Sequence, residues 1–169
     1  MKNIVLTGFM GTGKTAVARE LSSMIGMRIV DMDSEIEKEQ GVTINEIFAE
    51  YGEERFREIE TDMAKKVSEQ NGVVISTGGG VVLKEENIEY LRRNGHVVCL
   101  AASAEVILER TGRSDERPLL NVDDPLSKIK DLLEYRMPFY RNADIVIDTE
   151  GKTPRQVAEE IIKDLKWKK

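Results

Sequence analysis

The sequence predicts a three-layer α/β protein built on a parallel sheet, and three observations lead to this fold class. Five short apolar runs are distributed along the chain, and helical patterns lie between them. A phosphate-binding motif directly follows the first run. Parallel strands require long crossovers, which helices provide, so strands that alternate with helices favour a parallel sheet with helices on both faces.

The apolar runs are the predicted strands. They cover residues 4–6, 28–30, 73–75, 97–100 and 145–147. After the first strand, apolar residues recur at the spacing of one helix face: Val17, Ala18, Leu21, Met24 and Ile25. The final helix is predicted from a similar stripe: Val157, Ala158, Ile161, Ile162 and Leu165.

Capping residues mark the starts of further predicted helices. Thr43 and Glu46 fit a capping box, in which each side chain bonds to the other's backbone. Ser103 opens a segment that is predicted to end near residue 112. Thr153 precedes Pro154, which is the pattern of an N-cap followed by proline at the first helical position.

The phosphate-binding motif occupies residues 8–15, GFMGTGKT, and matches G-x-x-x-x-G-K-[ST] at every required position. Its glycines allow consecutive backbone N–H groups to turn toward an anion, and the following helix adds its positive dipole end. Lys14 can then reach the β- and γ-phosphates, and the Thr15 hydroxyl can bind Mg²⁺. With a strand before it and a helix after it, the motif predicts nucleoside triphosphate binding.

The bulk properties restrict the class of protein. At 169 residues we expect one domain over residues 1–169, with no apolar run near the ~20 residues that span a bilayer. The chain starts directly with strand and loop, so we expect no signal or transit peptide and a cytoplasmic location. The net charge of −6 argues against a nucleic-acid partner, and local cations must bind the polyanionic nucleotide. Cys99 lies in an apolar run and is predicted to be buried.

Two insertions are too polar to be predicted as core. Residues 34–70 form a long helical excursion rich in Glu, Lys and Arg, and residues 111–124 form a charged segment. In a phosphoryl-transfer enzyme, such segments become a substrate-binding module and a mobile lid. The alternative is that they are ordinary surface helices and a loop.

Two acids end the second predicted strand, Asp31 and Asp33. The carboxyl ends of parallel strands are where ligands bind, and residues one apart on extended chain point to opposite sides. One acid could therefore steer the hydration shell of Mg²⁺ while the other accepts hydrogen bonds from a substrate hydroxyl. The alternative is that both cap the helix after Ser34. The third strand ends without an acid, so a standard Walker B aspartate is missing there.

Three further features are weak when taken singly. Residues 78–80 are three glycines at the end of a strand, which allow a ligand to approach bare backbone but also fit a flexible turn. Arg57 and Glu60 lie three apart on a predicted helix, so they share a face. Arg57 and Arg136 are each also compatible with an ordinary surface position.

The order and spacing of these features resemble the shikimate kinase family from Gly8 to about Pro154. The matching stretches are GFMGTGKT at residues 8–15, Asp31-x-Asp33, Phe56-Arg57-x-x-Glu60, Gly78-Gly79-Gly80, Arg117-Pro118-Leu119-Leu120 and Arg136-x-x-x-Tyr140. Met32 and Ala16 depart from the residues that the family often has at these positions, and neither is assigned to catalysis.

The resemblance implies a P-loop kinase fold related to nucleoside monophosphate kinases, with strand order 2-3-1-4-5. It implies Mg²⁺-dependent transfer of the ATP γ-phosphate to the 3-hydroxyl of shikimate, in the chorismate route to aromatic amino acids. The implied partners are ATP and shikimate alone, with no nucleic acid and no membrane, and we expect a monomer.

The resemblance also assigns site residues. Arg57, Arg136, Gly79 and Gly80 would hold the substrate carboxylate, and Asp33 the ring hydroxyls. Lys14, Asp33 and Arg117 would be catalytic, and Thr15 with Asp31 would hold Mg²⁺. The implied nucleotide-binding residues are Gly11, Thr12, Gly13, Lys14, Thr15, Ala16, Arg110, Arg117 and Pro154, with Arg110 and Pro154 on opposite sides of adenine.

Two other functions remain open from the residues alone. One is another small-molecule kinase on the same fold, such as a gluconate or nucleoside monophosphate kinase. The other is a non-catalytic, GTP-dependent switch. Such switches usually carry Asn-Lys-x-Asp after a late strand, whereas here residues 96–100 lead into Ala101-Ala102-Ser103-Ala104.

Overall fold

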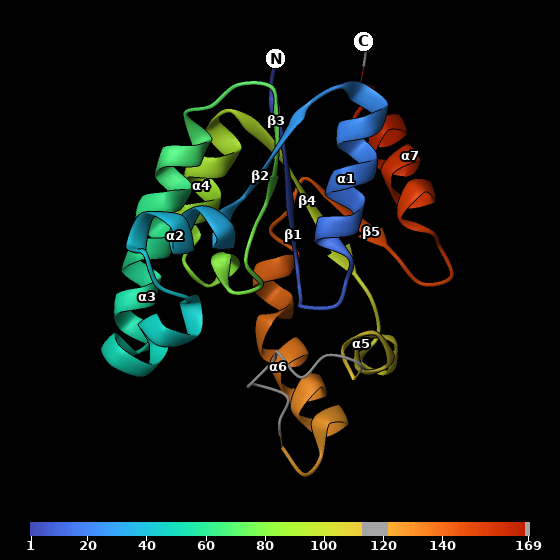
Figure 1. The fold of residues 1–169 in the computed structure, drawn as a ribbon. Coiled ribbons are helices and arrows are strands. Elements are labelled where there is room, and N and C mark those ends of the chain that lie inside the picture. Colours follow the sequence, from blue (N-terminus) through green and yellow to red (C-terminus); the bar gives the residue numbers. More distant parts are fainter. Residues whose placement is uncertain (113–121, 168–169) are drawn as a thin grey trace.

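The predicted apolar runs form five strands, each slightly longer than its run, in a computed structural model that describes residues 1–112 and 122–167 (Figure 1). The strands are β1 (Asn3–Gly8), β2 (Arg28–Asp31), β3 (Val73–Ser76), β4 (Gly95–Ala101) and β5 (Ile145–Asp148). The helices are α1 (Lys14–Ile25), α2 (Met32–Gln40), α3 (Ile44–Ser68), the short 3₁₀ helix η1 (Val81–Leu83), α4 (Glu85–Arg93), α5 (Ala104–Thr111), α6 (Pro125–Tyr140) and α7 (Pro154–Asp164).

The strands form one parallel sheet in the order β2-β3-β1-β4-β5, which confirms the implied order. The central strand, β1, pairs with β3 on one side and β4 on the other. Figure 1 shows α1 and α7 on one face of the sheet and α3 and α4 on the opposite face. The three-layer α/β prediction is therefore confirmed.

Side chains of β1 alternate between two apolar cores, one on each face of the sheet. Ile4 and Leu6 pack with α1 and α7, whereas Val5 packs with α3, α4 and α6. Burial on both faces explains why the strands read as continuous apolar runs rather than as an alternating pattern. Cys99 on β4 is buried as predicted, and this burial raises the pKa of its thiol to about 11.

Capping residues start the helices where the sequence predicted them. Thr43 and Thr153 both form complete capping boxes, and the Ser103 side chain accepts a hydrogen bond from the Val106 N–H. Gly52 interrupts α3, because its φ of 80° and ψ of 174° are not helical. The helix therefore consists of two parts that meet at this residue.

Two expectations about the segment after β2 are wrong. Asp33 does not end the strand: Asp31 accepts a hydrogen bond from the Ser34 N–H, which starts α2 at Met32 and puts Asp33 in the first helical turn. The insertion at residues 34–70 is also not wholly outside the core. The second part of α3 buries an apolar stripe that its many charges obscure in the sequence: Phe56, Ile59, Met63, Ala64 and Val67.

The predicted lid, residues 111–124, lies mainly outside the described residues, and Arg117 is among those not described. Within residues 1–112 and 122–167, no helix has the length and apolar character needed to cross a bilayer.

Candidate active site

The loop after β1 requires glycine at specific positions. Gly8 has a φ of 136°, and a Cβ on it would collide with the carbonyl oxygen of Leu100 on β4. Gly13 adopts a left-handed conformation with φ 95° as the N-cap of α1 and offers no capping side chain. The first N–H groups of α1 are thus not capped by the N-cap side chain and can bind an anionic ligand.

Lys14 and Thr12 both bond to the backbone of this loop. The Lys14 ammonium donates to the carbonyl oxygens of Gly8 at 2.8 Å and Phe9 at 3.0 Å. The Thr12 hydroxyl donates to the same Phe9 oxygen at 2.7 Å, and Thr12 is 2% exposed. Its hydroxyl therefore braces the loop rather than facing the cavity.

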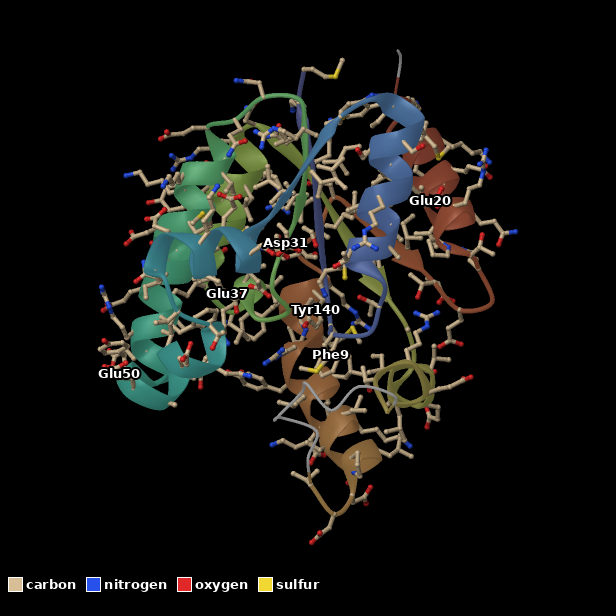
Figure 2. All side chains as sticks on the ribbon, in the orientation of Figure 1. Phe9, Glu20, Asp31, Glu37, Glu50 and Tyr140 are labelled. Carbon is tan, nitrogen blue, oxygen red and sulfur yellow. The ribbon has the colours of Figure 1, made fainter. Side chains whose placement is uncertain are left out.

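A cavity of about 1020 Å³ extends from this loop across the carboxyl ends of β2 and β3. It brings together most of the predicted site residues: Gly11, Gly13, Lys14, Thr15, Ala16, Asp31, Asp33, Arg57, Gly79, Gly80, Arg110 and Arg136. Thr12 and Pro154 are not among the lining residues. Figure 2 shows Phe9, Asp31 and Tyr140 near the centre of the molecule, whereas Glu50 lies on its outer edge.

Asp33 lines this cavity beside Gly78 in a partly buried position. Burial, and then the neighbouring Asp31 carboxylate, raise the pKa of Asp33 to about 6, while Lys14 and Arg57 oppose the shift. Asp33 thus titrates near neutral pH, which suits a group that exchanges a proton or hydrogen bond with a hydroxyl.

Arg57 is held by two carboxylates of α3. Its guanidinium bonds to Glu60 at 2.8 Å and to Glu53 at 3.2 Å. The side chain of Glu60 is only 2% exposed, whereas that of Glu53 is 64% exposed. Burial raises the pKa of Glu60, and the Arg57 charge opposes this shift. The predicted sharing of one helix face by Arg57 and Glu60 is confirmed.

The glycine turn at residues 78–80 lies directly against these charged groups. A Cβ on Gly78 would lie 2.9 Å from an Asp33 carboxylate oxygen, and a Cβ on Gly80 would collide with the Arg57 guanidinium. Glycine therefore lets the turn approach these side chains closely, and a larger residue would have to displace them.

Arg136 on α6 is a buried cation, not the surface arginine that its sequence context allows. The residue is 7% exposed, and its guanidinium lies 5.5 Å from the centroid of the Phe9 ring. One terminal nitrogen, Nη1, lies 3.5 Å from the Gly79 carbonyl oxygen. Its buried Nε has no hydrogen-bond partner among the described residues. A buried donor without a partner is costly, so this nitrogen favours an acceptor from a ligand.

Arg110 lies at the other end of the cavity, exposed beside the phosphate loop. It donates to the Gly11 carbonyl at 3.3 Å and to the Thr149 hydroxyl at 2.9 Å. Thr149 in turn bonds to the Ala101 carbonyl, so Arg110 links the loops after β1, β4 and β5. Pro154 is exposed at the start of α7.

Sequence reasoning gave no role to several residues that shape the site. Glu60 was predicted to share a helix face with Arg57, but not to be buried, and nothing local to Phe9 shows that its ring contacts Arg136. Four residues of the first part of α3 also line the cavity: Ile44, Asn45, Phe48 and Ala49. The capping box at Thr43 was the signal that a helix begins there.

Comparison with known proteins agrees with this geometry. A sequence model described as shikimate kinase matches residues 10–166. The chain belongs to the shikimate kinase family. A shikimate kinase of Thermodesulfovibrio yellowstonii is 52% identical over 97% of this chain and 95% of its own length. One from Caldicellulosiruptor bescii is 52% identical over 96% of this chain and 94% of its own length.

Among solved structures, shikimate kinase from Acinetobacter baumannii in complex with shikimate superposes with a TM-score of 0.92. It is 40% identical and covers 98% of this chain and 93% of its own chain. The family resemblance and the P-loop kinase fold expected from the sequence are thus confirmed.

Proposed function

We propose that the protein is a shikimate kinase that transfers the γ-phosphate of ATP to the 3-hydroxyl of shikimate, giving ADP and shikimate 3-phosphate. The observation that carries the proposal is the buried Nε of Arg136, which has no partner within residues 1–112 and 122–167 and belongs to a cavity that also contains the phosphate loop. A carboxylate in this cavity supplies the missing acceptor, and a nucleotide at the loop supplies the phosphate.

In this proposal, two arginines bind the acid from two sides. The planar guanidinium groups of Arg57 and Arg136 match a carboxylate, and the Gly79 and Gly80 backbone lies between them. Asp33 faces Gly78 and accepts hydrogen bonds from ring hydroxyls. The buried Arg136 discriminates strongly between charged and neutral ligands because a neutral ligand leaves its charge uncompensated.

Phosphoryl transfer then depends on position and charge. Its transition state is loose, so aligning the hydroxyl with the γ-phosphate matters more than a strong base. Asp33 orients this hydroxyl and, with its pKa of about 6, can take the proton that the hydroxyl loses. Lys14 would leave the carbonyls of Gly8 and Phe9 to bind phosphate oxygens, and Arg117 would add a second cation.

The donor set at the phosphate loop fits Mg²⁺. The Thr15 hydroxyl and the Asp31 carboxylate line the same cavity, and Mg²⁺ sites use few protein oxygens together with water and nucleotide phosphates. Asp31 uses one oxygen to cap α2 and keeps the other for a water-mediated contact. When bound, the ion neutralises charge on the β- and γ-phosphates. We assign adenine to the space between Arg110 and Pro154.

The test is an ADP-release assay with Mg·ATP and three acceptors: shikimate, gluconate and AMP. Gluconate is the sharpest competitor because it is also a hydroxylated monocarboxylate, but an open chain. We expect kcat/KM for shikimate to exceed that for gluconate and AMP by at least about a hundredfold, since unmatched buried polar groups penalise the wrong acceptor. Equal rates with gluconate would favour the gluconate kinase alternative.

We further propose that residues 1–169 act as one domain, with residues 34–70 as the acid-binding module and residues 111–124 as the lid that brings Arg117 to the phosphates. We also propose that the protein acts as a monomer in the cytoplasm. Size-exclusion chromatography with light scattering tests whether the protein is a monomer. Deletion of residues 111–124 tests the lid: we expect the shortened protein to release more ADP than it forms phosphorylated acid, because water then reaches the γ-phosphate.

A further inference from the structure

The glycine turn after β3 has to satisfy two conflicting requirements. Asp33 and Arg57 approach it so closely that a Cβ on Gly78 or Gly80 would displace one of these side chains. Consecutive glycines, however, prefer no single backbone conformation, so the peptides between them can reorient at little cost. The turn has two backbone hydrogen bonds of its own, from the Val81 N–H to the Gly78 carbonyl at 3.3 Å and from the Leu83 N–H to the Gly80 carbonyl at 3.0 Å. Neither bond uses the Gly79 carbonyl, so contacts from elsewhere have to fix the peptide that joins Gly79 and Gly80.

Contacts on both sides fix the ends of this turn. Upstream, the N–H and hydroxyl of Thr77 both donate to the Leu6 carbonyl, at 3.1 and 2.9 Å. Downstream, the side-chain amide of Asn87 on α4 donates to the Val81 carbonyl at 3.0 Å. The peptide that joins Gly79 and Gly80 lies midway between these anchors.

Tyr140 holds that central peptide. Its phenol donates to the Gly79 carbonyl oxygen at 2.7 Å from 61 positions away in the chain. Arg136 contacts the same oxygen at the longer distance of 3.5 Å. Tyr140 is 4% exposed at the end of α6, so water does not compete well for its hydroxyl.

Peptide geometry converts this contact into a direction for the neighbouring N–H. The structure contains no cis peptide in its described residues, so the Gly79 carbonyl and the Gly80 N–H point in opposite directions. With the carbonyl drawn toward Tyr140, the Gly80 N–H points away from Tyr140. The direction of the Gly80 N–H is thereby fixed relative to the guanidinium groups of Arg57 and Arg136, which lie against the same turn.

We propose that Tyr140 is a positioning residue for the acid substrate, which fixes the Gly79–Gly80 peptide so that its N–H group joins Arg57 and Arg136 in binding the carboxylate. The inference rests on the proposed function and adds to it the contact that holds the flexible turn in the orientation that binds the carboxylate. Burial raises the pKa of Tyr140 to about 12, so the phenol keeps its proton under ordinary assay conditions.

The experiment compares Tyr140→Phe with Tyr135→Phe, each folded protein being verified by thermal melting. Both lose one phenol hydroxyl from α6, but Tyr135 is 64% exposed and its ring packs against Phe139. We expect Tyr140→Phe to raise KM for shikimate about threefold to tenfold, the usual size for one buried neutral hydrogen bond. Turnover number and Mg·ADP affinity should stay within about twofold, and Tyr135→Phe should change none of these values.

A ligand comparison separates positioning from general loosening. The preference for shikimate over its methyl ester should fall in Tyr140→Phe by about the same factor as the KM rises, because the misplaced N–H serves the carboxylate. An unchanged preference, or a loss of turnover number with KM unchanged, would overturn the inference. If the wild-type protein shows no preference for the acid, the proposed function itself fails, which is a different result.

A measurement on the wild type covers the case in which Tyr140→Phe does not fold. Relaxation dispersion on protein labelled with ¹⁵N-glycine should show no microsecond-to-millisecond exchange at the Gly80 amide, although two glycines precede it. Its signal should move when shikimate is added. Exchange between two peptide orientations in the free protein would contradict anchoring by Tyr140.

Discussion

The two ends of the cavity are built in different ways. The nucleotide end comes mostly from one continuous segment, residues 8–15, and relies on backbone groups that the helix start leaves available. The acid end comes from four separate segments: α2, α3, the glycine turn and α6. Its working groups are charged side chains in buried positions. The first end is therefore robust and local, whereas the second depends on the tertiary fold.

The electrostatics of the acid end follow from this assembly. Arg57 has two carboxylate partners, while the buried Nε of Arg136 has no partner among the described residues. Asp33 has its pKa raised toward neutrality by burial. A buried donor without a partner and a carboxylate with a raised pKa both cost folding stability, and such groups are common where a ligand binds. If the two ends are separate, substitutions at one end should leave ligand binding at the other end unchanged.

The largest effect is expected at the nucleotide end. Lys14→Ala should lower kcat at least about a thousandfold, because a cation directed at the transferring phosphoryl group contributes several kcal/mol. Lys14→Arg should not restore it, since a planar guanidinium cannot follow the path of an ammonium inside the tight loop. Steady-state ADP release measures both, and a tenth of wild-type turnover in Lys14→Ala would refute the role.

Substitutions at the acid end should weaken the use of shikimate without changing nucleotide affinity. Arg57→Ala and Arg136→Ala should each lower kcat/KM for shikimate about tenfold to a hundredfold, the size of one charged hydrogen bond. Mg·ADP affinity, measured by calorimetry, should change by less than about threefold. A parallel loss of nucleotide affinity would mean that the two ends are not separate.

The two arginine variants should differ in stability. Arg57→Ala leaves the buried Glu60 carboxylate beside Asp33 without its cation, so we expect Tm to fall by at least about 5 °C. Arg136→Ala removes only the weaker attraction that Arg136 exerts on Glu60, which keeps its direct partner Arg57, and should lower Tm less. Thermal melting at pH 7.5 checks this order, and the opposite order would contradict the pairing of Arg57 with Glu60.

Nucleotide binding should stabilise the fold by mass action. Mg·ADP at about a hundred times its dissociation constant should add roughly 2.7 kcal/mol, which corresponds to a Tm rise of roughly 5–10 °C. The control is Mg·GDP at the same concentration, which should raise Tm less. Equal shifts would show that the expected preference for adenine is wrong.

The smallest effect concerns Asp33 and pH. Because the folded-state pKa of about 6 lies above the ordinary value of 3.8, the folded protein binds this proton more tightly than the unfolded chain. Asp33 therefore costs no stability below about pH 4, and the cost grows as pH rises to about 6. Asp33→Asn should raise Tm by about 2–6 °C at pH 8, and by only about a third as much near pH 4.5.

The same variant should lose activity while it gains stability. Wild-type kcat/KM should fall as pH drops through about 6, and Asp33→Asn should be much less active with this limb absent. Melting curves and pH–rate profiles on both proteins give the result. If Asp33→Asn is less stable than the wild type and has the same pH–rate profile, Asp33 is not the group that titrates in the reaction.

The sequence predicted well whatever is local. The phosphate loop, the caps at Thr43, Ser103 and Thr153, and the five strands all depend on neighbours within a few residues, so their patterns are visible in the chain. The strand-end placement of Asp33 was wrong, and the alternative that the acids cap a helix proved correct for Asp31. Aspartate is a common N-cap residue, and its bond from the Ser34 N–H ends the strand before Asp33.

Contacts that join distant segments could not be predicted from the residues alone. The buried face of α3 is hidden among charged residues, and Arg136 and Tyr140 meet Gly79 only through the fold. The family resemblance named Arg57 and Arg136. It did not indicate that Arg57 has carboxylate partners, or that Arg136 has a nitrogen with no partner in the part of the chain that the structure describes.

The most direct test of the central claim is kcat/KM for shikimate and for its methyl ester, on wild type and Arg136→Ala. If the acid end is built to bind a carboxylate, the wild type should prefer the acid by about tenfold to a hundredfold, and the variant should lose most of this preference. Equal wild-type values for acid and ester would contradict the claim and reopen the identity of the substrate.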